Sequence, residues 1–175
     1  MPVLWFSIPH CFRYERMTKG RRREHFQWNA DIIGQSGVTA EAEILLLLIN
    51  ACREMGLTDA EFRIFLNDRR ILNSILEKIE VPPNLHDSVL VIMDKRDKVS
   101  PESFSEMLVE SGMNSSQVEQ LKEHLAIPEL ESLTKLLPDC EGITALQELS
   151  ELIKISGFSS YIQFDVSIVR GLSYY

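Results

Sequence analysis

Two stretches of alternating side chains, separated by a basic loop, constrain the fold of this chain more than any other feature. From Cys11 to Arg16 and from His25 to Ile32, side chains alternate in character with a period of two, which is typical of β-strands covered on one face. Residues 17–24 form the basic loop between them. The sequence therefore predicts an amphipathic β-hairpin.

Each predicted strand gathers its polar side chains on one face. The residues that share this face are Cys11, Arg13 and Glu15 in the first strand and His25, Gln27, Asn29 and Asp31 in the second. They are consistent with a solvent-facing sheet whose charges pair across the strands, or with a ligand site. In a ligand site, Arg13 would suit a phosphate or carboxylate, Gln27 a polar edge, and Asp31 an ammonium or imidazole N–H.

The next predicted elements are a helix, a short strand and a second helix. The first helix runs from Thr39 to Met55, with Thr39 as its N-cap and Gly56 just beyond its end. The alternation from Phe62 to Leu66 predicts a strand, and residues 67–79 return to helical spacing. Pro82 and Pro83 stop that helix and mark the best internal boundary.

Beyond the two prolines the chain predicts a small acidic lobe of helices. One helix opens at Ser100-Pro101, another at Ser115 or Ser116, and helical spacing from Leu130 to Ile155 is broken at residues 138–142. Period-two alternation returns from Tyr161 to Val169, with a bend expected at residues 169–171. We therefore expect an α+β fold in which the chain comes back to the sheet.

Charge is distributed unevenly along the chain. The formal net charge is −8, which argues against nonspecific binding to nucleic acid or anionic lipid through the global field. Residues 13–24 nevertheless carry a surplus of about four positive charges. This loop fits a solvated turn, a nucleic-acid contact or a polyphosphate clamp, and the chain contains neither of the common glycine-rich nucleotide motifs.

Several classes of site and segment find no support in the sequence. The three cysteines are odd in number and widely spaced, which argues against a disulfide framework or a paired-cysteine metal site. The four histidines lack a two-ligand spacing, so we expect no metal site, and no serine has the context of a hydrolase nucleophile. The longest apolar stretch, Ile44–Ile49, is too short to span a membrane, and no targeting segment is visible.

Two segments resemble a known family. Residues Trp5 to Gly34 read WFSIPHCFRYERMTKGRRREHFQWNADIIG and resemble motif 2 of the class II aminoacyl-tRNA synthetases in its histidyl form. Residues Ile162 to Tyr175 read IQFDVSIVRGLSYY and resemble the more specific histidine signature RGLxYY. The segments FLNDRRIL and VIMDKRDKVS are also similar to the family, so the chain is identified as a member of the histidyl-tRNA synthetases, in a form similar to plant and bacterial members.

The resemblance implies an incomplete class II catalytic core with an antiparallel sheet. Residues 1–81 would be the part of the core that contains motif 2, residues 82–160 a helical insertion that approaches the acceptor arm of the tRNA, and residues 161–175 the return strand. The family's motif 1, which builds its homodimer interface, its motif 3 and its anticodon-binding domain have no counterpart here. We therefore expect a fragment that is inactive alone, from a cytoplasm or, in a plant, from a chloroplast or mitochondrion.

The resemblance also assigns roles around the nucleotide. Arg13 would bridge the α-phosphate of ATP and the carboxylate of histidine, while Glu15 and Arg21 would face the nucleotide. Magnesium would arrive with the ATP phosphates rather than in a protein cage. The implied reaction is attack of the histidine carboxylate on the α-phosphorus with loss of pyrophosphate, followed by transfer of histidine to tRNA(His).

A second group of residues would bind histidine. Gln27 and Asp31 would hold its amino group, Arg170 would be the second essential arginine, and Tyr174 and Tyr175 would line the imidazole pocket. His25 stands where the family commonly has an aromatic residue that stacks on adenine, and Phe26 should face away from the site.

Two further readings belong to other functional classes. The first is a non-catalytic paralogue, such as the histidine-sensing regulatory subunit of ATP phosphoribosyltransferase, although a sensor has no need of both Arg13 and Arg170. The second is a free-standing RNA-binding module that uses the basic loop, whose affinity would fall steeply with salt and would not respond to ATP.

Overall fold

The computed structural model describes residues 1–14, 16 and 18–169 and has the predicted α+β character. Its strands are β1 (Val3–Ser7), β2 (His10–Phe12), β3 (Glu24–Phe26), β4 (Asn29–Ile33), β5 (Ile64–Leu66) and β6 (Ile162–Phe164). Its α-helices are α1 (Val38–Glu54), α2 (Arg69–Lys78), α3 (His86–Met93), α4 (Pro101–Glu110), α5 (Ser115–Leu125), α6 (Leu130–Leu136) and α7 (Glu141–Ile155). None of the described helices combines the length and apolar character that crossing a membrane requires.

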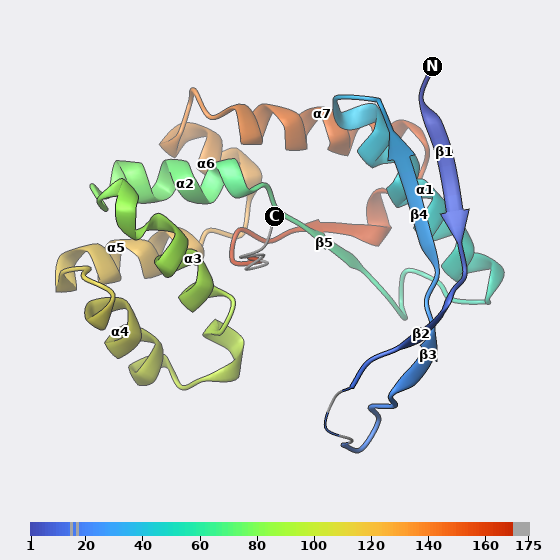
Figure 1. The fold of residues 1–175 in the computed structure, drawn as a ribbon. Helices are drawn as coiled ribbons and strands as arrows, with labels where there is room; N and C mark the ends of the chain where they lie inside the picture. Colours follow the sequence, from blue (N-terminus) through green and yellow to red (C-terminus); the bar gives the residue numbers. More distant parts are fainter. Residues whose placement is uncertain (15, 17, 170–175) are drawn as a thin grey trace.

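The predicted hairpin is present, but it is built from two short ladders. β2 pairs with β3 next to the basic loop, and β1, which the sequence did not predict, pairs with β4 further away; both pairs are antiparallel (Figure 1). The ladder changes at Pro9, which has no N–H to donate but accepts a hydrogen bond from the backbone of Gln27 at 3.1 Å. The second predicted strand is therefore divided into β3 and β4.

Helix α1 begins one residue earlier than predicted, and its N-cap is Gly37 rather than Thr39. Gly37 has a φ of 99°, a left-handed conformation that a residue without Cβ adopts readily. The hydroxyl of Thr39 instead accepts a hydrogen bond from the side chain of Gln35 at 2.7 Å. The C-terminal end agrees with the prediction, since the helix closes at Met55 and Gly56 follows in the left-handed region.

β5 and β6 form a parallel pair, which corrects the expectation of a wholly antiparallel sheet. Ile64 lies opposite Ile162, and Leu66 lies opposite Phe164. Both strands are shorter than predicted: β5 lacks the first two residues of the expected strand, and β6 ends at Phe164 rather than near Val169. β6 ends because a turn follows it, in which the side chain of Asp165 accepts hydrogen bonds from the backbone and hydroxyl of Ser167, at 2.9 and 2.6 Å.

Beyond Pro83 the structure contains α3, which the sequence did not predict, followed by α4 to α7 in the predicted order with one cap reassigned. Ser100 caps α4 by accepting the backbone N–H of Ser103 at 3.2 Å, as expected. The N-cap of α5 is Asn114, which forms a reciprocal capping box with Gln117, rather than either predicted serine. The predicted break between α6 and α7 is also present.

One buried core connects α1 and α2 with the helical lobe. Helix α7 packs against both α1 and α2, and its buried side chains include Leu146, Leu149 and Ile153. The same cluster continues through Ile75 in α2 and Leu121 in α5. Figure 1 shows α3, α4 and α5 gathered at the end of the molecule opposite the β1–β4 pair, with α7 running between the two ends.

The chain turns into the lobe at Glu80, which has a φ of 58°. Glu80 is the one described non-glycine residue with a positive φ, and the conformation is unfavourable for a side chain with Cβ. The side-chain amide of Gln117 holds the turn by donating to the backbone carbonyls of Ile79 at 3.3 Å and Glu80 at 2.8 Å. The capping-box glutamine of α5, Gln117, therefore also fixes the path from α2 into the lobe.

Replacing Glu80 with glycine should stabilise the protein by up to about 1 kcal/mol, because glycine adopts the left-handed conformation without the steric penalty. The matched control is Glu77→Gly in the last turn of α2, where the same change should destabilise by about 1 kcal/mol. Chemical denaturation measures both free energies of unfolding. Equal effects of the two substitutions would contradict the assignment of strain to Glu80.

The first turn of α7 lies close to the N-terminal end of α2 at Gly142. A Cβ at this position would lie 3.0 Å from Oδ1 of Asp68 and 3.1 Å from Cβ of Arg70. Asp68 cannot easily move, because it accepts hydrogen bonds from the backbone N–H of Arg70 at 2.8 Å and from the Arg70 guanidinium at 2.7 Å. The guanidinium of Arg70 holds the pKa of this carboxyl below its ordinary value.

We expect Gly142→Ala to destabilise the protein by about 1 kcal/mol, although alanine is the better helix former, because the contact with Asp68 outweighs helix propensity. A thermal unfolding series on the wild-type and Gly142→Ala chains checks this. A rise in the unfolding midpoint would show that the two helix ends have room to separate.

Candidate functional site

The hairpin places the predicted polar residues on a common face. Cys11 lies opposite His25 in the β2–β3 register, and the backbone N–H of Arg13 donates to the carbonyl of Arg23 at 2.8 Å, which extends that ladder toward the loop. Phe26 lies on the other face, as predicted, where its ring stacks on that of His10 with centroids 5.0 Å apart. The alternation with a period of two therefore predicted correctly which face of the hairpin each of these residues occupies.

A row of polar side chains continues along β4. The side-chain amide of Gln27 donates to Oδ1 of Asn29 at 2.7 Å, and Nδ2 of Asn29 donates to the hydroxyl of Ser7 at 3.3 Å. Asp31 follows two residues later, exposed and opposite Trp5 in the β1–β4 register. The structure thus brings Gln27 and Asp31 to the same strand face, with Asn29 fixing the orientation of the Gln27 amide.

Arg13 and Arg21 line one hollow of about 360 Å³ at the basic end of the hairpin. Its other lining residues are Gly20, Arg22, Glu24 and His25. The loop turns here through Gly20, with a φ of 87°, and the backbone N–H of Arg21 donates to Thr18 at 3.0 Å. Guanidinium groups that converge on an open hollow are suited to bind phosphate or carboxylate oxygens.

The hollow is electrostatically mixed rather than purely cationic. Glu24 carries the one carboxylate among the described residues that line the hollow. Its Oε2 lies 3.7 Å from Nε2 of His10. The guanidinium of Arg23 stacks on Tyr14, 4.7 Å from the ring centroid. Three arginines against one carboxylate leave a positive balance at the hollow, inside a chain whose total charge is negative.

The remaining predicted site residues, Glu15, Arg170, Tyr174 and Tyr175, lie outside the described residues. The described part of the chain contains no group of three or more histidine, cysteine or acidic residues that could hold a metal. The described residues of the hairpin include side chains that can bind anionic and polar ligand atoms, but no group of metal ligands.

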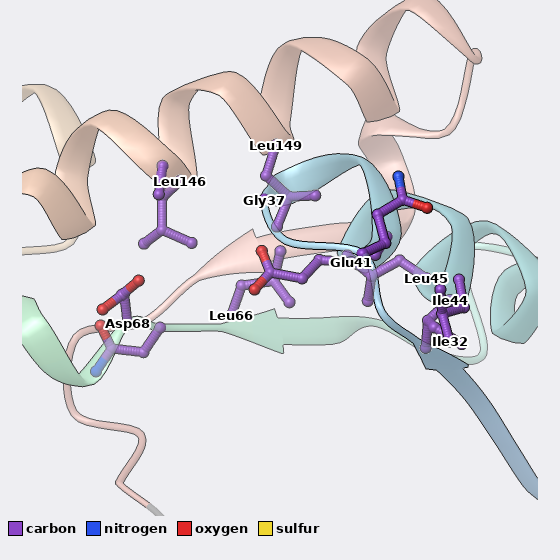
Figure 2. Close-up of a pocket in the computed structure, with 13 residues that line it drawn as sticks. Ile32, Gly37, Glu41, Ile44, Leu45, Leu66, Asp68, Leu146 and Leu149 are labelled. Carbon is purple, nitrogen blue, oxygen red and sulfur yellow. The ribbon is translucent and has the colours of Figure 1, made fainter. Parts of the chain in front are cut away.

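A second hollow, of about 520 Å³, was not predicted from the sequence. It lies among the end of β4, the first turns of α1, the end of β5 and helix α7. Figure 2 shows Glu41 and Asp68 at its polar side and Leu146 and Leu149 of α7 at its apolar side. The segments that line this hollow are distant in sequence, so local patterns could not predict it. The only local indication was the pair of polar residues, Asn67 and Asp68, that follows β5.

Asn67 lines this second hollow and connects β5 with the segment after β6. Its Nδ2 donates to the backbone carbonyls of Val166 at 2.9 Å and Ile168 at 3.0 Å. Its Oδ1 is buried and has no hydrogen-bond partner among the described residues. Sequence reasoning placed Asn67 only at the start of a helix and missed these contacts.

Comparison with protein families identifies one match across nearly the whole chain. The family model described as histidyl-tRNA synthetase matches residues 3–175. The chain is 40% identical over 176 residues to the chloroplastic/mitochondrial histidine–tRNA ligase of Arabidopsis thaliana, covering 100% of this chain and 36% of that protein. It is 33% identical over 182 residues to the histidine–tRNA ligase of Pyrococcus horikoshii, covering 99% of this chain and 41% of that protein.

Solved structures agree in fold. A histidyl-tRNA synthetase from Nostoc sp. PCC 7120 superposes with a TM-score of 0.81 at 20% identity, over 98% of this chain and 42% of that one. A protein from Bacillus halodurans, described as an ATP phosphoribosyltransferase regulatory subunit/histidyl-tRNA synthetase, gives a TM-score of 0.81 at 19% identity, over 100% of this chain and 46% of that one. At these identities the likeness establishes the fold alone.

The chain spans less than half the length of each of these relatives. The match to the family model and the identity to the Arabidopsis ligase nevertheless confirm the resemblance inferred from its motifs. The chain belongs to the histidyl-tRNA synthetase family.

Proposed function

We propose that this chain contributes part of the histidine and ATP site of a histidine–tRNA ligase. The observation that carries the proposal is the common face of the hairpin: Arg13 and Arg21 line one hollow, and Gln27 and Asp31 follow on the same strand face. A cationic hollow beside a row of polar acceptors suits a nucleotide phosphate next to an amino acid. Membership of the histidyl-tRNA synthetase family supports this assignment of the four residues.

In the proposed reaction the histidine carboxylate attacks the α-phosphorus of ATP and pyrophosphate leaves; histidine then passes to the terminal ribose of tRNA(His). Arg13 would stabilise the charge that develops at the α-phosphate, which is usually the largest catalytic contribution. Gln27 and Asp31 would hold the histidine ammonium and so align the carboxylate for attack. Glu15 and Arg21 would contact the nucleotide.

Arg170, Tyr174 and Tyr175 complete the proposed histidine site from the other end of the chain. Arg170 would share the developing charge with Arg13, and the two tyrosines would contact the imidazole. Magnesium would be held by the ATP phosphates, because the hollow at Arg13 has several cations and Glu24 as its one described carboxylate. The chain's own contribution there is to bind and orient the phosphates.

We also propose that residues 82–160 form the helical insertion between two parts of the catalytic core, residues 1–81 and 161–175. Acidic residues outnumber basic residues in this insertion, so the positive loop of the hairpin is the better phosphate contact. The Arabidopsis relative is named as chloroplastic/mitochondrial. This supports an organelle as the compartment if the chain comes from a plant, and a cytoplasm otherwise.

A histidine-sensing regulatory subunit is the second candidate. It is supported by the Bacillus halodurans structure, whose description names such a subunit together with the synthetase. A sensor would use Gln27 and Asp31 to bind histidine but would not need the phosphate contacts of Arg13. The two candidates therefore differ in whether Arg13 acts on turnover or is dispensable.

The 175-residue chain alone should not catalyse histidine-dependent exchange between ATP and pyrophosphate, because it spans 36% of the Arabidopsis ligase and lacks the family's remaining ATP contacts. The measurement is radiolabel exchange with purified chain, with and without histidine. Exchange above the histidine-free background would show that this segment suffices for adenylate formation.

Turnover should require Arg13 once the missing parts are supplied. The test protein is the Arabidopsis ligase with its matching segment replaced by residues 3–175 of this chain, which should be active. Arg13→Gln should lower its exchange rate by at least about 100-fold, through loss of transition-state charge stabilisation. The assay is steady-state exchange at saturating histidine.

The matched control for this experiment is Arg16→Gln, which removes the same charge three residues further along the chain, at an exposed residue that does not line the hollow. It should change the rate by no more than about threefold, as expected for an exposed charge. An inactive chimera that folds and dimerises would count against the ligase proposal. Equal losses for the two variants would count against the role of Arg13.

A further inference from the structure

Two side-chain hydrogen bonds in series connect β1 with Gln27. Ser7 lies opposite Asn29 in the β1–β4 register, and Nδ2 of Asn29 donates to the hydroxyl of Ser7 at 3.3 Å. Oδ1 of Asn29 accepts a hydrogen bond from Nε2 of Gln27 at 2.7 Å. Asn29 therefore uses one end of its amide to bind the neighbouring strand and the other end to hold Gln27.

The side chain of Asn29 lies on the face of β4 that points away from helix α1. Ala30 and Ile32 alternate with Asn29 along the strand, and both line an apolar cleft together with Ile44 of α1. Because successive side chains of a strand point to opposite faces, Asn29 and Asp31 share the other face. The polar residues therefore lie on the side of the sheet where a ligand has access.

The hydrogen bond between Gln27 and Asn29 determines which end of the Gln27 amide can meet a ligand. A glutamine amide accepts hydrogen bonds at Oε1 and donates them at Nε2. Since Nε2 faces Asn29, Oε1 lies at the other end of the amide. Both residues are half-buried, so water competes less for their hydrogen bond than it does at an exposed pair.

The direction of this amide matters because Asp31 on the same face is also an acceptor. Its carboxylate is exposed and accepts hydrogen bonds only. An amide that presents Oε1 adds a second acceptor, and the two together suit a ligand group that only donates, such as an ammonium. An amide turned the other way would present N–H groups, which repel an ammonium.

We infer that Asn29 is a positioning residue that makes Gln27 an acceptor for the amino group of the bound amino acid. The inference rests on the proposed function, in which Gln27 and Asp31 hold the histidine ammonium, and it adds the residue that sets the direction of the Gln27 amide. Asn29 acts through Gln27 and does not line the basic hollow. Its loss therefore weakens recognition of the amino group and leaves ATP binding unchanged.

The kinetic test uses the chimera of the Arabidopsis ligase described above. Asn29→Ala should raise the KM for histidine about fivefold, as expected when one net hydrogen bond is lost. The KM for ATP should stay within about twofold, because Arg13 and Arg21 line a hollow to which Asn29 does not contribute. Steady-state exchange at varied histidine and varied ATP gives both values.

Aspartate at position 29 should restore what alanine removes. A carboxylate can still accept the Nε2 proton of Gln27, and the Ser7 hydroxyl can rotate to donate to it. Because a carboxylate cannot donate, it enforces the same direction of the Gln27 amide. Asn29→Asp should therefore keep the histidine KM within about twofold of the parent chimera.

Two histidine analogues test whether the effect is confined to the amino group. Histidinol keeps the amino group and lacks the carboxylate, whereas imidazolepropionate keeps the carboxylate and lacks the amino group. Asn29→Ala should raise the inhibition constant of histidinol about fivefold and leave that of imidazolepropionate within about twofold. A general distortion of the site would raise the two inhibition constants equally and would contradict the inference.

The matched control is Asn73→Ala, the same substitution at a half-buried residue of α2. It should leave both KM values and both inhibition constants within about twofold of the parent chimera. Thermal unfolding of each variant separates a loss of folding from a loss of positioning. An active chimera in which Asn29→Ala leaves the histidine KM unchanged, or in which Asn29→Asp raises it as much as Asn29→Ala does, would overturn the inference.

A second measurement uses the 175-residue chain itself and does not depend on activity. By NMR, the Nε2 proton of Gln27 that bonds Asn29 should exchange with water about fivefold faster in Asn29→Ala than in the parent chain. It should exchange within about twofold of the parent rate in Asn29→Asp. The side-chain amide of Gln117, which donates to Ile79 and Glu80, is the internal reference and should not change.

The two measurements separate failure of the inference from failure of the proposed function. Unchanged exchange of the Gln27 proton in Asn29→Ala would overturn the inference whether or not the chimera is active. An inactive parent chimera would instead count against the proposed function, and the exchange rates would still decide whether Asn29 holds Gln27.

Discussion

The packing of α7 against α1 and α2 is the interaction on which the rest of the structure depends. Its buried leucines meet α1, which packs against β4, and its N-terminal turn meets the capped end of α2. Burial of each such side chain contributes about 1.5–3 kcal/mol, so this one helix accounts for a large part of the stability of both segments. Without it the hairpin and the lobe would share little apolar contact.

Local patterns predicted the elements well where neighbours in sequence are also neighbours in space. The hairpin, the end of α1 at Gly56 and the Ser100 cap all follow from periodicity or from a single backbone preference. β1 was missed because its apolar run carries no alternation, and both of its faces are largely exposed. The parallel pairing of β5 and β6 was missed because a local pattern carries no information about which distant strand will be the partner.

The site divides in the same way. Parity along one strand was enough to place Gln27 and Asp31 on a common face and to turn Phe26 away from it. No local rule could join Asn67 to Val166, since the two follow different strands and meet only when the chain has returned. Hydrogen bonds between polar side chains and segments that are distant in the sequence could therefore not be predicted from local patterns.

The long return of the chain also has a consequence for how the molecule folds. The contact between Asn67 and Val166 joins residues 99 positions apart, and helices α2 to α7 lie between them in the sequence. Loop-closure entropy therefore delays the β5–β6 pair until the intervening helices have folded and shortened the distance to be closed. We expect the edge of β5 to stay uncovered until the ribosome has completed β6, and so to be open to a chaperone for as long as β6 is missing.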